Sequence, residues 1–373
     1  MVMGGVIPLA SARGFWGGHR KPPAEAGGMT RTTPTTDGLK KSPAIDGREK
    51  SCVPFSYTMW MNKSSLVSAL FAACAVGFIG LPACVAVDPS RSAPGDGLRV
   101  FVMGHSFHIF VADRLTPLAD AAGISGHELL GRQMIGGSSV RQHWDLPDGK
   151  NAAKAALVAG DVDVLTMSPN WLVPDDAIPL FTDLGTEHNP ELRVLLQISW
   201  MAFDHWEPLD PKLWNPARKI HHNEERDSRT LDGLRAANEA ITAVIERQVA
   251  DINRARGRDV IRLVPVNDAV LCLRERVAAG DVPGIARQSE LFTDPIGHGK
   301  TPVMALATYC NFACLYGRSP VGLDDGDRQL DGIHPELRPF LQQIAWDVVT
   351  ANPMSGVTKE GFADPPARTP VVK

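Results

Sequence analysis

The hydrophobic positions of this chain form short apolar runs that alternate with longer stretches of helical spacing. The runs predict buried strands over residues 98–104, 127–135, 162–167, 193–200 and 259–266. Helical spacing follows over residues 107–122, 151–160, 175–188, 230–256, 302–316 and 337–349. Strands that alternate with helices need crossover connections, which make a sheet mainly parallel and cover both of its faces. The sequence therefore predicts an α/β fold, a three-layer α/β/α sandwich around about five strands.

The first predicted strand ends at Gly104, and Ser106 follows directly before a predicted helix. Strand, tight turn and helix in this order lift a hydroxyl above the carboxyl edge of the sheet and aim helix amides at whatever the hydroxyl attacks. Sites in parallel sheets lie at that edge, where the next two strands end at Gly136-Gly137 and Asn170. Each residue also has an ordinary reading, because serine caps helices, glycine relaxes turns and asparagine caps them.

Taken together, Ser106, Gly137 and Asn170 resemble the SGNH (GDSL-like) hydrolase superfamily, in particular a secreted bacterial subgroup. The first three sequence blocks of that superfamily contribute a serine, a glycine and an asparagine in this order. The resemblance covers most of residues 98–350 in layout. It implies a flavodoxin-like SGNH fold, with Ser106 as the nucleophile and Gly137 and Asn170 in the oxyanion hole.

The fourth block of the superfamily, an aspartate followed closely by a histidine, has two candidates here. Asp331 and His334 have the better spacing, because the family motif is Asp-x-x-His-Pro. Asp294 and His298 have the better context, because residues 305–323 resemble the tract that follows the catalytic histidine in the secreted subgroup. We take His298 with Asp294 as the expected pair and leave the other pair open.

Two neighbours of the site depart from the family pattern. His105 and Trp171 stand where aspartate is usual, which we expect to affect specificity more than chemistry. Tryptophans also fall just beyond strand ends or in the loop over residues 201–229, namely Trp144, Trp171, Trp200, Trp206 and Trp214. An aromatic wall suits stacking on sugar rings, although the same residues could instead seal a long loop. On this basis Trp171, Trp144 and His105 are the expected substrate-binding residues.

Composition divides the chain further. Residues 1–60 are rich in Gly, Pro, Thr and basic residues, so we expect them to be disordered or an extension that the natural protein lacks. Residues 61–86 have the charged start, apolar run and small-residue site of a signal peptide. Residues 87–97 read as a linker and residues 98–352 as the SGNH hydrolase-like domain. We expect residues 353–373 to be a disordered tail.

The signal peptide predicts a secreted or periplasmic protein. Residues 81–84 resemble a lipoprotein processing box, which would leave a lipid on Cys84 as the one membrane attachment; cleavage after Ala86 is the alternative. The formal net charge of −4 and the lack of a dense basic run give no reason to expect nucleic acid. The histidines have no acidic or thiolate partners at ligand spacing, so we expect no metal and no cofactor.

These observations predict a secreted serine esterase that acts on a small-molecule or glycan ester. Ser106 would attack the ester carbonyl, His298 would take its proton, and Asp294 would orient the imidazole. The amides of Ser106 and Gly137 and the side chain of Asn170 would hold the oxyanion. Small acyl groups such as acetyl on carbohydrate are the expected substrates. Two alternatives stay open: an inactive SGNH-fold protein that binds carbohydrate or cell wall, and a lipase or thioesterase with an apolar acyl channel.

Overall fold

The computed structural model describes residues 97–207 and 219–363. The expected signal peptide, the lipidation site at Cys84 and Trp214 lie outside the described residues. Within the described residues, no helix combines the length and the apolar character that crossing a membrane would require.

A five-stranded sheet runs through the middle of the domain in the order β2-β1-β3-β4-β5. Every neighbouring pair in it is parallel. The strands are β1 (Arg99–Gly104), β2 (Glu128–Met134), β3 (Val164–Met167), β4 (Arg193–Gln197) and β5 (Ile261–Val264). β3 is buried throughout, as expected of a Val- and Leu-rich run in a sheet covered on both faces. The predicted three-layer α/β sandwich is confirmed.

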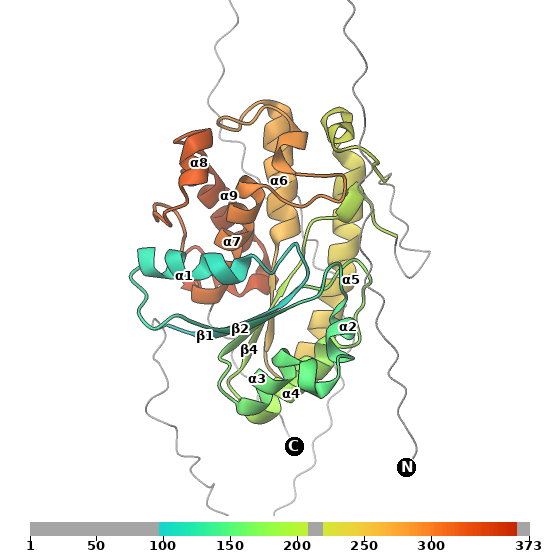
Figure 1. Cartoon of the computed structure of the whole chain (residues 1–373), viewed down its shortest axis with the longest axis vertical. Helices are drawn as coiled ribbons and strands as arrows, with labels where there is room; N and C mark the ends of the chain where they lie inside the picture. The colour runs from blue at the N-terminus through green and yellow to red at the C-terminus, as the bar shows by residue number, and fades with distance from the viewer. Residues whose placement is uncertain (1–96, 208–218, 364–373) are drawn as a thin grey trace, which may run out of the picture. The chain divides into compact units, whose positions relative to one another are not determined.

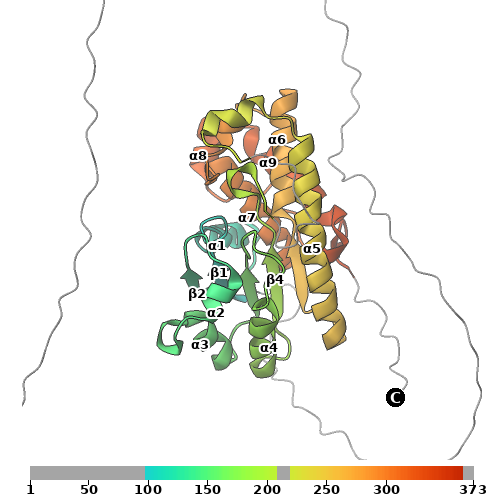
Figure 2. The same cartoon turned by 90° about the vertical axis from the view of Figure 1, so that its right-hand side faces the viewer.

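Different helices cover the two faces of the sheet (Figures 1 and 2). One face carries α1 (Val111–Ala121), α6 (Val266–Ala279), α7 (Thr301–Tyr316) and α9 (Leu337–Ala351). The other carries α3 (Ala152–Ala159), α4 (Ile178–His188) and α5 (Asp232–Arg256). Shorter helices and 3₁₀ turns join them: α2 (Val140–Trp144), η1 (Asp148–Lys150), η2 (Ala202–Asp204), η4 (Asn223–Ser228), η5 (Gln288–Leu291), α8 (Arg328–Ile333) and η6 (Pro353–Ser355).

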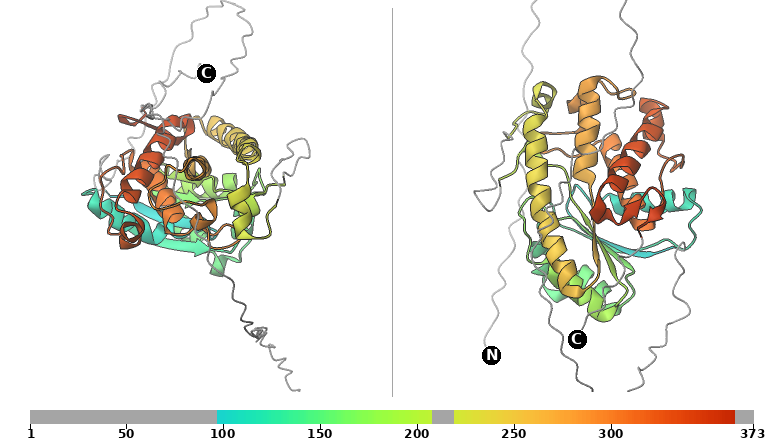
Figure 3. Two further views of the ribbon diagram at one scale, coloured as in Figure 1. Left: turned by 90° about the horizontal axis from the view of Figure 1, so that it is seen from above. Right: turned by 180° about the vertical axis from the view of Figure 1, so that it is seen from behind.

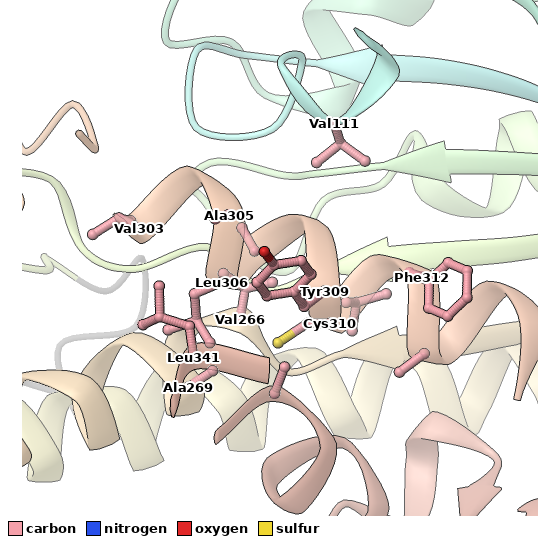
Figure 4. Close-up of a cluster of buried hydrophobic side chains, with 14 of the residues drawn as sticks. Val111, Val266, Ala269, Val303, Ala305, Leu306, Tyr309, Cys310, Phe312 and Leu341 are labelled. Atoms are coloured by element: carbon pink, nitrogen blue, oxygen red, sulfur yellow. The ribbon is translucent and has the colours of Figure 1, made fainter. Parts of the chain in front are cut away.

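The central helix of the larger core is α7, in which every residue except Thr301 and Met304 is buried. A helix that is apolar on all sides is stable only inside a protein, so its neighbours must surround it. Figure 4 shows Leu306 and Phe312 of α7 among side chains from α1, α6 and α9. Seen from behind, α6 lies between α5 and α9 (Figure 3). This packing fixes the start of α7, which follows the segment that carries His298.

Helix α1 and the C-terminal tail do not begin where the sequence predicts. Helix α1 begins at Val111 and not at residue 107; residues 106–110 form a separate turn, in which the Ile109 amide donates to the His105 carbonyl. The amides at the start of α1 therefore do not directly follow Ser106. The expected tail also begins too early, because β6 (Val357–Thr358) and β7 (Gly361–Phe362) form a hairpin. The Phe362 ring lies against the guanidinium groups of Arg193 and Arg262, which ties the hairpin to β4 and β5.

Candidate active site

Ser106 lies in a turn that a buried polar network supports from below. Gly104 ends β1, and a Cβ there would come within 3.2 Å of His108 Cδ2, so glycine lets His108 fold back beneath the turn. His108 is fully buried, with Nδ1 2.9 Å from Gln197 Oε1 and Nε2 3.0 Å from Thr166 Oγ1. Burial lowers the pKa of His108 to about 4, so its imidazole is neutral. His108 therefore joins the turn after β1 to β3 and β4 through its two ring nitrogens.

His105 supports the same turn from the other side. Its Nδ1 accepts a hydrogen bond from the Phe107 amide, and its Nε2 lies 3.2 Å from the Pro169 carbonyl oxygen. The side chain is 3% exposed, and burial lowers its pKa. The ring is packed between the serine turn and the end of β3, and its contacts hold Ser106 close to the Asn170 segment. His105 also lines a small cavity beside Asn170, and its role in substrate binding stays a prediction.

Ser106, His298 and Asp294 form a continuous chain of hydrogen bonds. His298 Nε2 lies 3.0 Å from Ser106 Oγ, and His298 Nδ1 lies 2.7 Å from Asp294 Oδ2. The other carboxylate oxygen accepts from the amides of Gly297, at 2.9 Å, and His298, at 3.2 Å. The three side chains therefore have the connections of nucleophile, base and orienting carboxylate.

Local hydrogen bonds shape the loop that carries Asp294 and His298. An antiparallel bridge joins Phe292 to Gly299, and the Thr293 amide donates to the His298 carbonyl. Burial opposes ionisation of Asp294, but the hydrogen bonds from the His298 ring and the two loop amides outweigh it. The pKa of this carboxyl is consequently lower than its ordinary value. Asp294 is thus a carboxylate at neutral pH and can stabilise a protonated imidazole.

The alternative pair lies elsewhere and is engaged differently. His334 ends α8, and its Nδ1 accepts from the Glu336 amide at 3.1 Å. Asp331 pairs with Arg338 and Arg328. The ring of His334 is therefore a cap for the turn that precedes α9, and the hydrogen bond to Ser106 comes from His298.

Asn170 and Gly137 approach each other at the ends of β3 and β2. Asn170 Nδ2 donates to the Gly137 carbonyl at 3.0 Å, and Asn170 Oδ1 accepts from the Leu172 amide at 2.8 Å. Gly137 has a φ of 64°, a left-handed conformation that favours glycine. Within residues 97–207 and 219–363, no hydrogen bond occupies the backbone amides of Ser106 or Gly137. Two free amides and a second Asn170 amide hydrogen are thus available as donors.

Of the five tryptophans predicted to form an aromatic wall, the four that the structure describes are buried or half-buried. Trp200 and Trp206 are 7% and 1% exposed. Trp144 is half-buried, edge-on to Phe181 at 5.0 Å with Lys154 over its ring. Trp171 is half-buried and packs against both cores, and its carbonyl accepts from Trp206 Nε1. Trp144 thus contacts α3 and α4, and its role in substrate binding stays a prediction. Trp171 and Trp200 line a small cavity beside Asn170.

The sequence and the structure were each compared with those of known proteins. No protein-family profile matches the sequence, and no curated protein matches it. The structure is similar to a DUF4886 family protein from Bacteroides uniformis, with 15% identity over 70% of this chain and 98% of that one and a TM-score of 0.42. It is also similar to a protein assigned to the SGNH hydrolases from Slackia heliotrinireducens, with 16% identity over 58% of this chain and 98% of that one and a TM-score of 0.34. A protein assigned to the GDSL-like lipases from Parabacteroides merdae has 11% identity over 60% of this chain and 98% of its own, with a TM-score of 0.35.

The chain is similar to SGNH and GDSL-like proteins of known structure. Three residues that support the site were given no supporting role from the sequence. Phe107 stacks on Trp200 at 4.7 Å and meets the His298 ring edge-on at 5.5 Å. Arg226 donates to the backbone of the Asp294 segment. Phe107 follows the serine directly and Trp200 lies at a predicted strand end, so both had a sequence signal, whereas Arg226 becomes a neighbour of the site only through folding. Among the described residues, no group of three or more His, Cys, Asp or Glu side chains is placed to hold a metal ion.

Proposed function

We propose that this protein is a serine ester hydrolase of the SGNH type. The observation that carries the proposal is the chain from Ser106 Oγ through His298 to Asp294, with separations of 3.0 and 2.7 Å. With its proton on Nδ1, held by Asp294, His298 presents a bare Nε2 to the serine hydroxyl and can accept its proton. Ser106 Oγ then attacks the ester carbonyl.

The tetrahedral intermediate carries a negative oxygen that needs preorganised donors. The unoccupied amides of Ser106 and Gly137 and the Asn170 amide group can supply them, and each such donor contributes roughly 3 to 4 kcal/mol to lowering the barrier. Collapse of the intermediate expels the alcohol, which receives the proton from His298 Nε2. Water, deprotonated by the same nitrogen, then attacks the acyl-enzyme, releases the acid and restores Ser106.

We propose a short acyl group, with acetyl as the first choice. The cavity beside the nucleophile turn, lined by Phe107, Asn170 and Trp171 among others, measures about 20 Å³ and accommodates a group of about the size of one water molecule. Acetylated carbohydrates are the natural esters to test, although the buried tryptophans no longer favour them. Met134 at the end of β2, and Leu172 and Ile296 in the loops that carry Asn170 and His298, are 39–51% exposed. They favour an alcohol with an apolar face.

The proposed enzyme acts outside the cytoplasm. The signal-like residues 61–86 support secretion or a periplasmic location, and Cys84 would anchor the protein if it is lipidated. N-terminal sequencing of natural protein, together with labelling by a fatty acid, tests both. A mature chain that retains residues 1–50 would overturn this location.

Reaction with a fluorophosphonate probe tests the chemistry. We expect wild type to be labelled and to hydrolyse p-nitrophenyl acetate, and both properties to be lost in Ser106→Ala and strongly reduced in His298→Ala. His334→Ala is the matched control and should behave like wild type. Acetate release from acetylated glycans, set against p-nitrophenyl octanoate hydrolysis, tests the acyl length. Folded wild type that is not labelled but binds glycans equally well with Ser106→Ala would instead identify a binding protein.

A further inference from the structure

The loop that carries the proposed acid and base is held by its backbone carbonyls. Each of the five carbonyls from residue 294 to residue 298 accepts a hydrogen bond. Four of them accept from donors outside the loop. Arg226 donates to the carbonyls of residues 294 and 295. The Phe203 amide donates to the carbonyl of residue 296, and Trp200 Nε1 donates to that of residue 297. All these external donors belong to the segment that follows β4.

Arg226 makes the most contacts with this loop. It is fully buried, and its two terminal nitrogens donate to the carbonyls of Asp294 and Pro295, both at 3.0 Å. Its guanidinium carbon lies 4.5 Å from the centre of the Phe292 ring, at the base of the same loop. A planar guanidinium holds two carbonyls in a fixed relative geometry, whereas the ammonium group of a lysine ends a flexible chain and does not fix their directions.

A buried acidic residue holds Arg226 in turn. Asp204 is 2% exposed and receives a bidentate pair of hydrogen bonds from Arg274, both 2.8 Å, while Arg226 Nε approaches it at 3.4 Å. Phe203 and Asp204 have positive φ angles of 56° and 51°. Non-glycine residues adopt this conformation only where the surroundings impose it, and such positions cluster at functional sites. In this turn the Phe203 amide donates to the Ile296 carbonyl, and the Asp204 carboxylate pairs with Arg274 and Arg226.

We propose that Arg226 is a positioning residue for the reaction: it binds the carbonyls of two successive peptide groups, those of Asp294 and Pro295, and so keeps His298 within reach of Ser106. We call this pair of hydrogen bonds the clamp. The inference rests on the proposed function for its kinetic test and on geometry alone for its spectroscopic one. Asp294 and His298 lie on an exposed loop without regular structure of its own beyond one bridge. Fixed carbonyls therefore replace the rigidity that a helix or strand would give.

The test compares Arg226→Met with Arg226→Lys. Methionine keeps the apolar contact with Phe292 and leaves Asp204 paired with Arg274, so the variant should fold. We expect kcat on p-nitrophenyl acetate to fall about 100-fold in Arg226→Met and about 10-fold in Arg226→Lys, with KM changed less than about threefold. A second readout is the downfield proton resonance of His298 Nδ1, which should shift or broaden in Arg226→Met.

The matched control is Arg338→Met. Arg338 is also a buried arginine, 8% exposed, but it pairs with Asp325 and Asp331, away from the loop. We expect this variant to melt earlier while kcat and the downfield resonance stay at wild-type values. Equal kcat and equal resonances in Arg226→Met and wild type would overturn the clamp, as would equal losses in both methionine variants. Wild type without turnover would refute the proposed function, and the resonance would then decide the clamp by itself.

Discussion

Replacing Asp294 by asparagine should reverse the polarity of the His298 ring. The carboxylate oxygen Oδ1 accepts from the amides of Gly297 and His298, so the asparagine must place its oxygen there. Its amide nitrogen then takes the position of Oδ2, 2.7 Å from His298 Nδ1 in the wild type, and donates to that nitrogen. The ring proton is forced onto Nε2, which points at Ser106 and can no longer accept a proton.

The magnitude follows from the cost of turning the asparagine around. Restoring the active tautomer would set the amide NH₂ against two backbone N–H groups. The His298 amide would lose its acceptor, and the Gly297 amide would keep only the Asp294 carbonyl at 3.1 Å. One unsatisfied donor costs about 1–3 kcal/mol and loss of the second bond of the Gly297 amide about 1 kcal/mol, so the active form lies roughly 3 kcal/mol above the inactive one. At about 1.4 kcal/mol per factor of ten, Asp294→Asn should reduce kcat/KM about 100-fold.

Initial rates with p-nitrophenyl acetate and a melting curve for each protein measure this effect. Asp331→Asn is the control, because Asp331 belongs to the pair that does not contact Ser106 and instead bonds to Arg328 of α8 and Arg338 of α9. We expect it to stay within about threefold of wild type, as is usual for changes outside a site. An Asp294→Asn protein that melts normally and retains more than about a tenth of the activity would refute the reasoning about the tautomer.

Three further outcomes are expected. Asn170→Ala should lower kcat about 100- to 1,000-fold in the p-nitrophenyl acetate assay through loss of one oxyanion donor; unchanged kcat would exclude this role. Leu306→Ala, at a fully buried position of α7, should lower the free energy of unfolding by about 2–5 kcal/mol in urea titrations. Burial raises the pKa of Asp268 from 3.8 to about 6 in the folded protein. The folded protein is therefore most stable with respect to this group below pH 3.8 and loses stability as the pH rises to about 6. Asp268→Asn should therefore stabilise the protein by up to roughly 3 kcal/mol at pH 8 and hardly at pH 4, as thermal unfolding at the two pH values would show.

Local patterns were sufficient for the sheet and for three of the site positions. The strand that ends at Gly104 and those that end shortly before Gly136 and Asn170 could be predicted because buried strands are short apolar runs bounded by turn residues. Parallel strands place their carboxyl ends at one edge, which explains why residues far apart in sequence were expected to meet. The start of α1 was misplaced because residues 106–110 have helical spacing but form only a turn. Spacing along the chain does not distinguish the two.

The sequence by itself determined the α/β/α architecture and the order in which Ser106, Gly137 and Asn170 follow their strands, since each depends on a few neighbouring residues. Only the tertiary structure decided between His298 and His334, because the hydrogen bond to Ser106 joins residues 192 positions apart. It also decided that the described tryptophans near the strand ends are buried or half-buried and that Arg226 reaches the Asp294 loop. Periodicity reports which residues are buried, whereas the partners of a buried or half-buried side chain depend on how distant loops pack against one another.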